Sequence, residues 1–370
     1  MQGTIKNFFP GGNTSKGFYS YYKYILKQDE ARRIICIKGG PGTGKSSLMK
    51  KVSKYFNEKG YDIEHHHCSS DNNSLDGIVI KELNVAIVDA TAPHVVDPIN
   101  PGAVDEVLNM GDCWDEEGFK KNRHKIIGIN KKVGKTFQRA YRFFGAAKLV
   151  YDDWHTYNNE ALNIDKLNIL KEDLKKSLFT TTPANIGYDR HLFATAFTPN
   201  GIITYIENLS AGYKNIYVLK GGPGTGKSNV LEFLSTEALR RGYYVEIFHT
   251  PLIPEKIEHI LIPDLNIAIL TSNEINNLDL HGIVIDMKDC LNLSTLEDTK
   301  VEMQYDSTEF YSLLNKGLAT IKGAKSLHDE LETYFIPNMD FSKLDDVFTN
   351  VIKKLNGYEE DYLNQSNAPF

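Results

Sequence analysis

A nine-residue stretch rich in glycine occurs twice in this chain, letter for letter. It reads KGGPGTGKS at residues 38–46 and again at residues 220–228. Both copies fit the phosphate-loop pattern G-x-x-x-x-G-K-[ST], in which glycines let backbone N–H groups point inward around phosphate oxygens. The lysine of this pattern reaches the β- and γ-phosphates, and the serine hydroxyl binds Mg²⁺. The repeat therefore predicts two sites for a nucleoside triphosphate.

The residues on either side of each copy predict the strand and the helix that such a loop needs. An apolar run at residues 33–37 precedes the first copy, and a similar run at residues 216–219 precedes the second. Short apolar runs of this kind are typical of buried strands. After each loop, apolar residues recur at helical spacing until a glycine that stops the helix. These residues are Leu48, Val52, Tyr55, Phe56 and Gly60 in the first copy, and Val230, Leu234, Ala238 and Gly242 in the second.

The similarity between the two parts extends well beyond the loops. The first glycines, at positions 39 and 221, are 221 − 39 = 182 residues apart, and the same offset relates residues 83–87 to residues 265–269. We therefore expect two domains, residues 1–182 and residues 183–370, the second an internal repeat of the first. Strands alternate with helices in each domain. This order predicts an α/β fold, a mostly parallel sheet flanked by helices and followed by a C-terminal helical hairpin.

The composition is that of an ordinary globular protein. The chain has 370 residues, 41% of them hydrophobic and 24% charged, with a net charge of −6. This acidic balance argues against a surface built as a whole for nucleic acid. No apolar run approaches the roughly 20 residues that cross a membrane, and the first residues lack the apolar core of a signal peptide. The four cysteines have no C-x-x-C spacing, so we expect reduced thiols and a cytoplasmic location.

Both loops are expected to bind ATP, with Mg²⁺ as the metal cofactor. Lys45 is expected to act on the phosphates, and Ser46 and Ser228 to bind the metal. The predicted nucleotide-binding residues are Gly39, Gly40, Pro41, Gly42, Thr43, Gly44, Lys45, Ser46 and Ser47 in the first copy, and Gly221, Gly222, Pro223, Gly224, Thr225, Gly226, Lys227, Ser228 and Asn229 in the second.

A further strand that ends in aspartate usually holds the Mg²⁺ shell in phosphate-loop enzymes. Asp89 follows the apolar run at residues 85–88 and is the predicted metal-holding carboxylate of the first copy. The aligned residue of the second copy is Thr271, which brings no negative charge, and Asp286 on the next strand is a candidate replacement. We therefore expect the first site to hydrolyse ATP and the second site to bind nucleotide or to regulate the first.

Hydrolysis also requires a group that orients water. Glu64 and His67 lie on a predicted strand of residues 61–67, and both recur in the second copy, as Glu246 and His249. Either residue is a candidate for this catalytic role, although both also suit packing within the sheet. Alternation along a strand puts the two side chains on opposite faces, so they need not act together.

Two other functions stay open at this point. The polar stretch of residues 69–77 suits a loop beside the γ-phosphate, and an acceptor pocket there would indicate a small-molecule or nucleotide kinase. Ten basic residues lie between Lys120 and Lys148 with no acidic residue among them. They would suit an acidic partner or a nucleic acid, in a nucleotide-gated binding module. A solvated turn and a solvated helix face are the plain alternatives for these two stretches.

The paired loops and the two-copy layout resemble a bacterial family of tandem P-loop ATPases. The resemblance covers the whole chain, including the LDG of residues 75–77 and the TAPHVVDP of residues 91–98, where His94 is a further candidate near the phosphates. It implies ATP binding and ATPase or kinase-like character. The loop is also similar to those of AAA and recombinase-type ATPases, but the separation between Lys45 and Asp89 is short for a typical AAA module, and Ala90 stands where a glutamate would follow.

Overall fold

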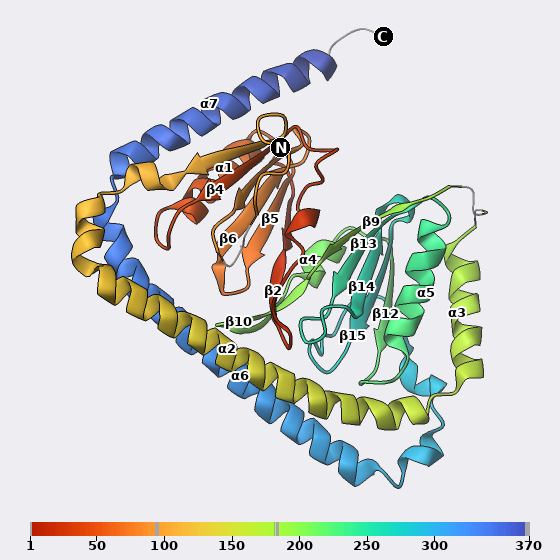
Figure 1. The fold of residues 1–370 in the computed structure, drawn as a ribbon. Helices are drawn as coiled ribbons and strands as arrows, with labels where there is room; N and C mark the ends of the chain where they lie inside the picture. The colour runs from red at the N-terminus through yellow and green to blue at the C-terminus, as the bar shows by residue number, and fades with distance from the viewer. Residues whose placement is uncertain (1, 93–95, 181, 183–184, 367–370) are drawn as a thin grey trace. The chain divides into compact units, whose positions relative to one another are not determined.

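The chain forms two compact units in the computed structural model, which describes residues 2–92, 96–180, 182 and 185–366 (Figure 1). Unit 1 comprises Met1–Gly11, Ser20–Thr136 and Lys322–Phe370, and unit 2 comprises Gly12–Tyr19 and Phe137–Ile321. Each unit is built around one six-stranded sheet. The candidate residue His94 lies outside the described residues.

The sheet of unit 1 has the strand order β1-β5-β6-β7-β4-β8. Strand β6 is antiparallel to both of its neighbours, while the pairs β1–β5, β7–β4 and β4–β8 are parallel. Strands β4 and β7 lie inside the sheet and are apolar except for charged residues at their ends, as strands covered on both faces usually are. The bounds are β1 Ile5–Phe8, β4 Arg33–Lys38, β5 Ile63–Cys68, β6 Asp71–Ile80, β7 Val85–Asp89 and β8 Asp105–Asn109.

The sheet of unit 2 repeats this arrangement strand for strand, in the order β9-β13-β14-β15-β12-β16. Strand β14 is the antiparallel one here. The predicted α/β class is confirmed, and the sheets are mixed because one strand in each returns as a hairpin. The bounds are β9 Tyr188–Leu192, β12 Asn215–Lys220, β13 Tyr244–His249, β14 Ile257–Ile262, β15 Ile267–Ser272 and β16 Ile283–Asp286.

Short elements complete the described chain. Two hairpins are formed by β2 (Gly11–Thr14) with β3 (Gly17–Ser20) and by β10 (Thr195–Thr198) with β11 (Gly201–Thr204). The short helices are α4 (Ile206–Ser210) and the 3-10 turns η1 (Tyr22–Tyr24), η2 (Met110–Cys113), η3 (Pro263–Leu265), η4 (Met287–Cys290), η5 (Leu293–Leu296) and η6 (Ile336–Asn338). All four cysteines are free and buried. Within the described part of the chain, no helix combines the length and the apolar character that crossing a membrane requires.

Each unit takes a covering helix from the other half of the sequence. In unit 1, α7 (Phe341–Ser366) packs on α1 (Lys45–Glu58), with Val351 and Leu355 buried in the same apolar cluster as Val52. In unit 2, α3 (Ile164–Leu178) packs on α5 (Lys227–Leu239) in the corresponding way. Apolar faces of α1 and α5 that their own sheets leave uncovered are thereby removed from water.

The compact units therefore differ from the predicted domains 1–182 and 183–370. Helix α2 (Glu116–Glu160) has 45 residues and α6 (Lys300–Phe335) has 36. At 1.5 Å per residue they measure about 68 and about 54 Å, against roughly 30 Å for a small domain. Each of these two helices begins among the residues of one unit and ends among those of the other. The predicted C-terminal hairpins consequently do not fold back onto their own sheets.

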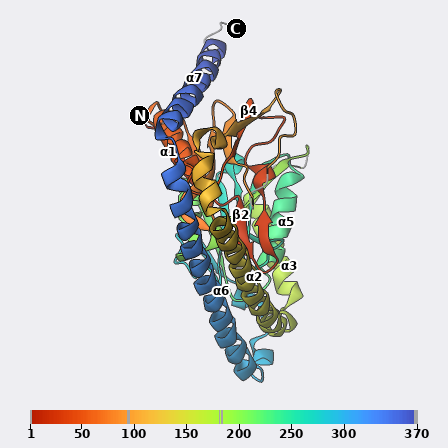
Figure 2. The ribbon, with the colours of Figure 1, turned by 60° about the vertical axis from the view of Figure 1, so that its left-hand side comes forward.

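The second half of α2 packs along the first half of α6 within unit 2. Figures 1 and 2 show the two helices side by side. Phe144 and Phe310 are fully buried in the apolar cluster between them. A side chain on Gly317 would lie 2.3 Å from the Phe144 ring, so glycine is needed for this close approach.

Candidate functional site

The first glycine-rich loop joins β4 to α1 and is tightly curled. Gly42 and Gly44 have φ angles of +65° and +87°, in the left-handed region that glycine adopts at low cost. The end of α6 lies directly against the loop, because a Cβ on Gly40 would come within 2.2 Å of the Phe335 ring. The predicted strand, loop and helix are thus present in this order.

Lys45 and Asp89, predicted to share one site, are brought together at the carboxyl edge of the sheet. Lys45 Nζ donates to the carbonyl oxygens of Gly39 (2.6 Å) and Gly40 (2.7 Å), and it lies 3.5 Å from Asp89 Oδ2. Asp89 ends β7 and pairs in register with Ile37 of β4, so the carboxylate stands one strand away from the start of the loop. Both side chains are largely buried, which strengthens their mutual attraction.

Ser46 Oγ, the third predicted group, accepts a hydrogen bond from the backbone N–H of Leu75 at 3.0 Å. This bond ties the start of α1 to strand β6. The prediction of a polar loop at residues 69–77 is therefore wrong from residue 71 onward, because Asp71–Ile80 forms β6. Pairing with β5 and the contact to Ser46 outweigh the turn preference of the asparagine and serine residues.

The second loop repeats the geometry of the first. Lys227 Nζ donates to Gly221 O (2.6 Å) and Gly222 O (2.5 Å), and Ser228 Oγ donates to Ile257 O at 3.3 Å. Burial lowers the pKa of Lys227 to about 8. Gly224 has φ +74°, and a Cβ there would come within 2.2 Å of the His155 carbonyl oxygen on α2. Both loops are thus held against the end of a long helix.

The two sites differ at the strand that ends beside the lysine. Thr271, at the position of Asp89, is buried and accepts a hydrogen bond from Asn273 Nδ2 at 3.1 Å. Asp286, the candidate replacement, ends β16 as an exposed residue and accepts a hydrogen bond from Lys288 N at 2.9 Å. It therefore serves as the cap of a 3-10 turn.

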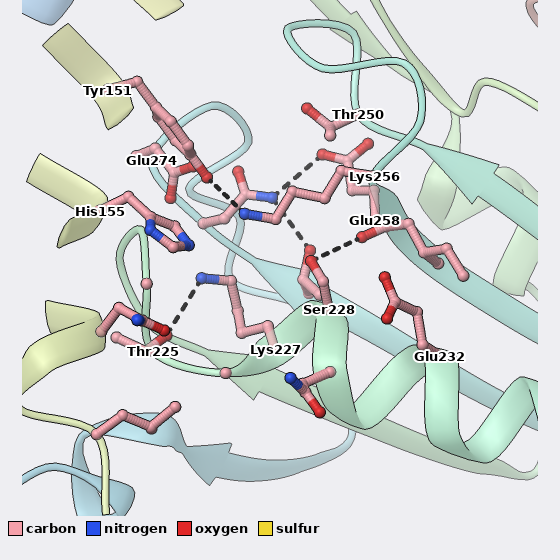
Figure 3. A pocket seen from close by; sticks show the side chains of 18 residues that line it. Tyr151, His155, Thr225, Lys227, Ser228, Glu232, Thr250, Lys256, Glu258 and Glu274 are labelled. Carbon is pink, nitrogen blue, oxygen red and sulfur yellow. Dashed lines mark hydrogen bonds between the residues drawn. The ribbon is translucent and has the colours of Figure 1, made fainter. Parts of the chain in front are cut away.

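A cavity opens beside the second loop and is lined by charged residues that the sequence did not single out (Figure 3). Lys256 Nζ donates to Tyr151 Oη at 3.2 Å, and burial lowers the pKa of this lysine. Glu258 is 2% exposed, and burial raises the pKa of its carboxyl to about 8. Glu232, Glu274 and His155 also line the cavity, and burial lowers the pKa of His155. The sequence does contain a signal for Glu258, because this residue aligns with Asp76 at the offset of 182.

The structure separates Glu64 from the loop. Glu64 is the second residue of β5, pairs in register with Val79, forms an ion pair with Lys81 (3.2 Å), and lies 3.3 Å from a ring nitrogen of His66. Val79 lies four residues beyond the Leu75 that contacts the loop helix, which is roughly 13 Å along a strand. A carboxylate at that distance does not reach the loop.

His67 lies nearer to the loop, opposite Leu75. Its ring nitrogens lie 3.1 Å from Asn72 O and 2.8 Å from Asn7 Oδ1, and burial lowers its pKa to about 4. The corresponding His249 lies 2.8 Å from a ring nitrogen of His191, and burial lowers its pKa to about 3. Both histidines are therefore neutral near pH 7 and are held by contacts within the sheet.

Comparison with known proteins gives one partial match. Residues 19–82 match a family model described as Nephrocystin 3, N-terminal, a region related to P-loop NTPase-like regions. The matched segment runs through β4, the first loop, α1 and the β5–β6 hairpin. No curated protein and no solved structure gave a significant match.

Proposed function

We propose that this chain binds ATP with Mg²⁺ at both glycine-rich loops and hydrolyses it mainly at the first. The proposal rests above all on the meeting of Lys45 Nζ and Asp89 Oδ2, 3.5 Å apart, beside a curled loop that leads into α1. A cation and an anion at this place suit the two parts of a metal-triphosphate complex. The match of residues 19–82 to a region related to P-loop NTPases supports the same reading.

In this proposal the hydrogen bonds now made to loop carbonyls are exchanged for bonds to phosphate. Lys45 Nζ would turn from Gly39 O and Gly40 O to the β- and γ-phosphate oxygens, as charge-assisted donors prefer. Ser46 and Asp89 would hold Mg²⁺, whose preferred ligands are oxygens, and the metal would neutralise charge on the phosphates. His67 is the nearer of the two catalytic candidates, and Glu64 is too distant for a direct role.

The Asp89→Asn variant tests this assignment. We expect it to lower ATP turnover roughly 10- to 50-fold, about 1.4–2.3 kcal/mol in barrier height. The amide keeps the shape of the side chain but removes the charge that holds the metal. Steady-state phosphate release at several Mg²⁺ concentrations measures the effect. Thr271→Ala, at the matching position of the second copy, is the control and should change turnover less than threefold. Equal effects of the two variants would contradict the assignment.

A second function is favoured by a regular stripe of basic residues on α2. Six residues alternate at spacings of three and four along one helix face, with Gly128 filling one step, and all six are exposed. The stripe is about 32 Å long at the rise of an α-helix. A line of regularly spaced cations suits the phosphate backbone of a nucleic acid. The six residues are Lys121, Lys125, Lys132, Lys135, Arg139 and Arg142.

Replacing Lys132, Lys135 and Arg139 together by glutamine tests the stripe. If nucleic acid binds there, the slope of log affinity against log salt should fall by about three, because each lost phosphate contact removes about one. Fluorescence anisotropy with labelled single- and double-stranded oligonucleotides gives this slope. The matched control replaces three exposed lysines elsewhere, Lys54, Lys176 and Lys353, by glutamine. If the salt slope of the stripe variant is unchanged, or if the chain binds an acidic protein but no oligonucleotide, nucleic-acid binding at the stripe is excluded.

A further inference from the structure

The cavity beside the second loop contains two buried carboxylate oxygens that receive no hydrogen bond of normal geometry from the described residues, although the Thr195 hydroxyl interacts with Glu258 and the Tyr151 hydroxyl with Glu274. They are Oε2 of Glu258 and Oε2 of Glu274. The other oxygen of Glu258 accepts hydrogen bonds from the side-chain amides of Asn276 (2.7 Å) and Asn273 (3.2 Å). His259 Nε2 lies 3.6 Å from Glu258 Oε2. A buried oxygen without a hydrogen bond of normal geometry has lost its contacts to water and gained no comparable contact in return. This points to a ligand that interacts with the oxygen.

Glu258 lies next to the position that holds the metal-binding carboxylate in the first copy. Asn273 Nδ2 donates both to Thr271 Oγ1 (3.1 Å) and to Glu258 Oε1 (3.2 Å), so one amide links the two side chains. On its other side, Glu258 follows Ile257, whose carbonyl oxygen accepts the Ser228 hydroxyl bond. The carboxylate is thus anchored between the loop serine and the residue that replaces Asp89.

The first copy treats the equivalent carboxylate differently. The β5–β6 and β13–β14 hairpins have matching registers, with His65 opposite Ile78 and Ile247 opposite Ile260, so Asp76 corresponds to Glu258. Asp76 accepts a hydrogen bond from the Tyr22 hydroxyl at 2.5 Å. The second copy therefore has glutamate where the first has aspartate, and Oε2 of this Glu258 is available to another partner.

The charges around the second loop fit a metal-phosphate complex. Lys227 and Lys256 line the cavity together with Ser228, and their ammonium groups suit phosphate oxygens (Figure 3). A carboxylate is repelled by phosphate oxygens unless a cation lies between the two groups, and such a cation would also favour the ionised form of Glu258, which burial alone disfavours. Hard divalent cations such as Mg²⁺ prefer carboxylate, hydroxyl and phosphate oxygens, and the first two kinds line this cavity.

We propose that Glu258 and Glu274 are the metal-holding carboxylates of the second site, in place of the strand-end acid that Thr271 lacks. The inference rests on the proposed binding of nucleotide at the second loop and adds to it the source of the metal ligands. Glu258 comes from the antiparallel strand β14, and Glu274 comes from the segment that follows β15. The second site is thereby a metal-dependent nucleotide site with a carboxylate set of its own.

The test compares nucleotide affinity with and without metal in the full chain. The Lys45→Ala variant silences the first loop, and calorimetry then measures ATP binding at the second loop in Mg²⁺ and in EDTA. We expect ATP to bind at least tenfold more tightly with Mg²⁺. Adding Glu258→Gln should reduce this advantage below threefold while leaving the affinity in EDTA unchanged or improved, because the amide keeps the contacts to Asn273 and Asn276 but loses the charge. A purely structural role would weaken binding under both conditions.

Matched variants and a spectroscopic probe complete the test. Glu274→Gln should also reduce the Mg²⁺ advantage, whereas Asp286→Asn, at an exposed acid on the edge strand β16 of the same sheet, should leave it intact. Bound Mn²⁺ in the ATP complex should be lost from the electron paramagnetic resonance spectrum of the Glu258→Gln variant at equal nucleotide saturation. A Mg²⁺ advantage that survives both glutamine changes overturns the inference. If the Lys45→Ala variant binds no ATP at all, the proposed nucleotide binding at the second loop is wrong, and the inference fails with it before either glutamate is changed.

Discussion

Replacing Lys45 by alanine is expected to lower ATP turnover by about 100-fold or more, about 2.7 kcal/mol or more in barrier height. The variant removes the buried ammonium that lies over the first loop and faces Asp89 at 3.5 Å. Phosphate release under saturating ATP and Mg²⁺, with circular dichroism to verify folding, measures the effect.

The control for this variant is built into the chain. Lys227→Ala makes the same change at the second loop, in the same sequence surroundings. We expect turnover to stay within threefold of the parent while the number of bound nucleotides per chain falls from two to one. If Lys227→Ala abolished turnover and Lys45→Ala did not, the hydrolytic site would be the second one.

Replacing Leu355 by alanine is expected to lower the free energy of unfolding of unit 1 by about 2–5 kcal/mol, the usual result of emptying a buried leucine site. Leu355 lies on α7, is fully buried, and belongs to the apolar cluster that also contains Val52 of α1. Hydrogen exchange of peptides from β4 and α1, together with urea unfolding, measures the change.

The outcome distinguishes the observed arrangement from two self-contained domains. Leu363→Ala, on the same helix but 46% exposed, is the control and should change stability by no more than about 0.5 kcal/mol. Destabilisation of β4 and α1 by a change at residue 355, about 300 positions later in the chain, requires α7 to cover unit 1. Equal and small effects of the two leucine variants would mean that α7 contributes nothing to that core.

Local sequence signals were sufficient to predict the centre of each site. The apolar run before each loop became β4 and β12, and the helical spacing after it became α1 and α5. The aspartate after residues 85–88 proved to end β7 beside Lys45. These features could be predicted because each depends on neighbours within a few residues, and parallel strands bring their carboxyl ends to one edge.

Features that depend on distant residues could not be predicted in the same way. The pattern of α7 indicates an apolar face but does not say which sheet that face covers, so the exchange of helices was missed. The turn-forming residues of 71–77 suggested a loop, whereas pairing with β5 makes them a strand. Glu258 was overlooked for the same reason, since its burial arises from the fold of β14.

The exchange of covering helices also bears on how such a chain can be divided. One repeat copy by itself would hold a loop, a sheet and an inner helix, but its outer helix would belong to a different core. That copy could protect its inner helix only by pairing with a second molecule, and its stability would then depend on concentration. Joining both copies in one polypeptide makes the pairing intramolecular, so that the fold persists at any dilution.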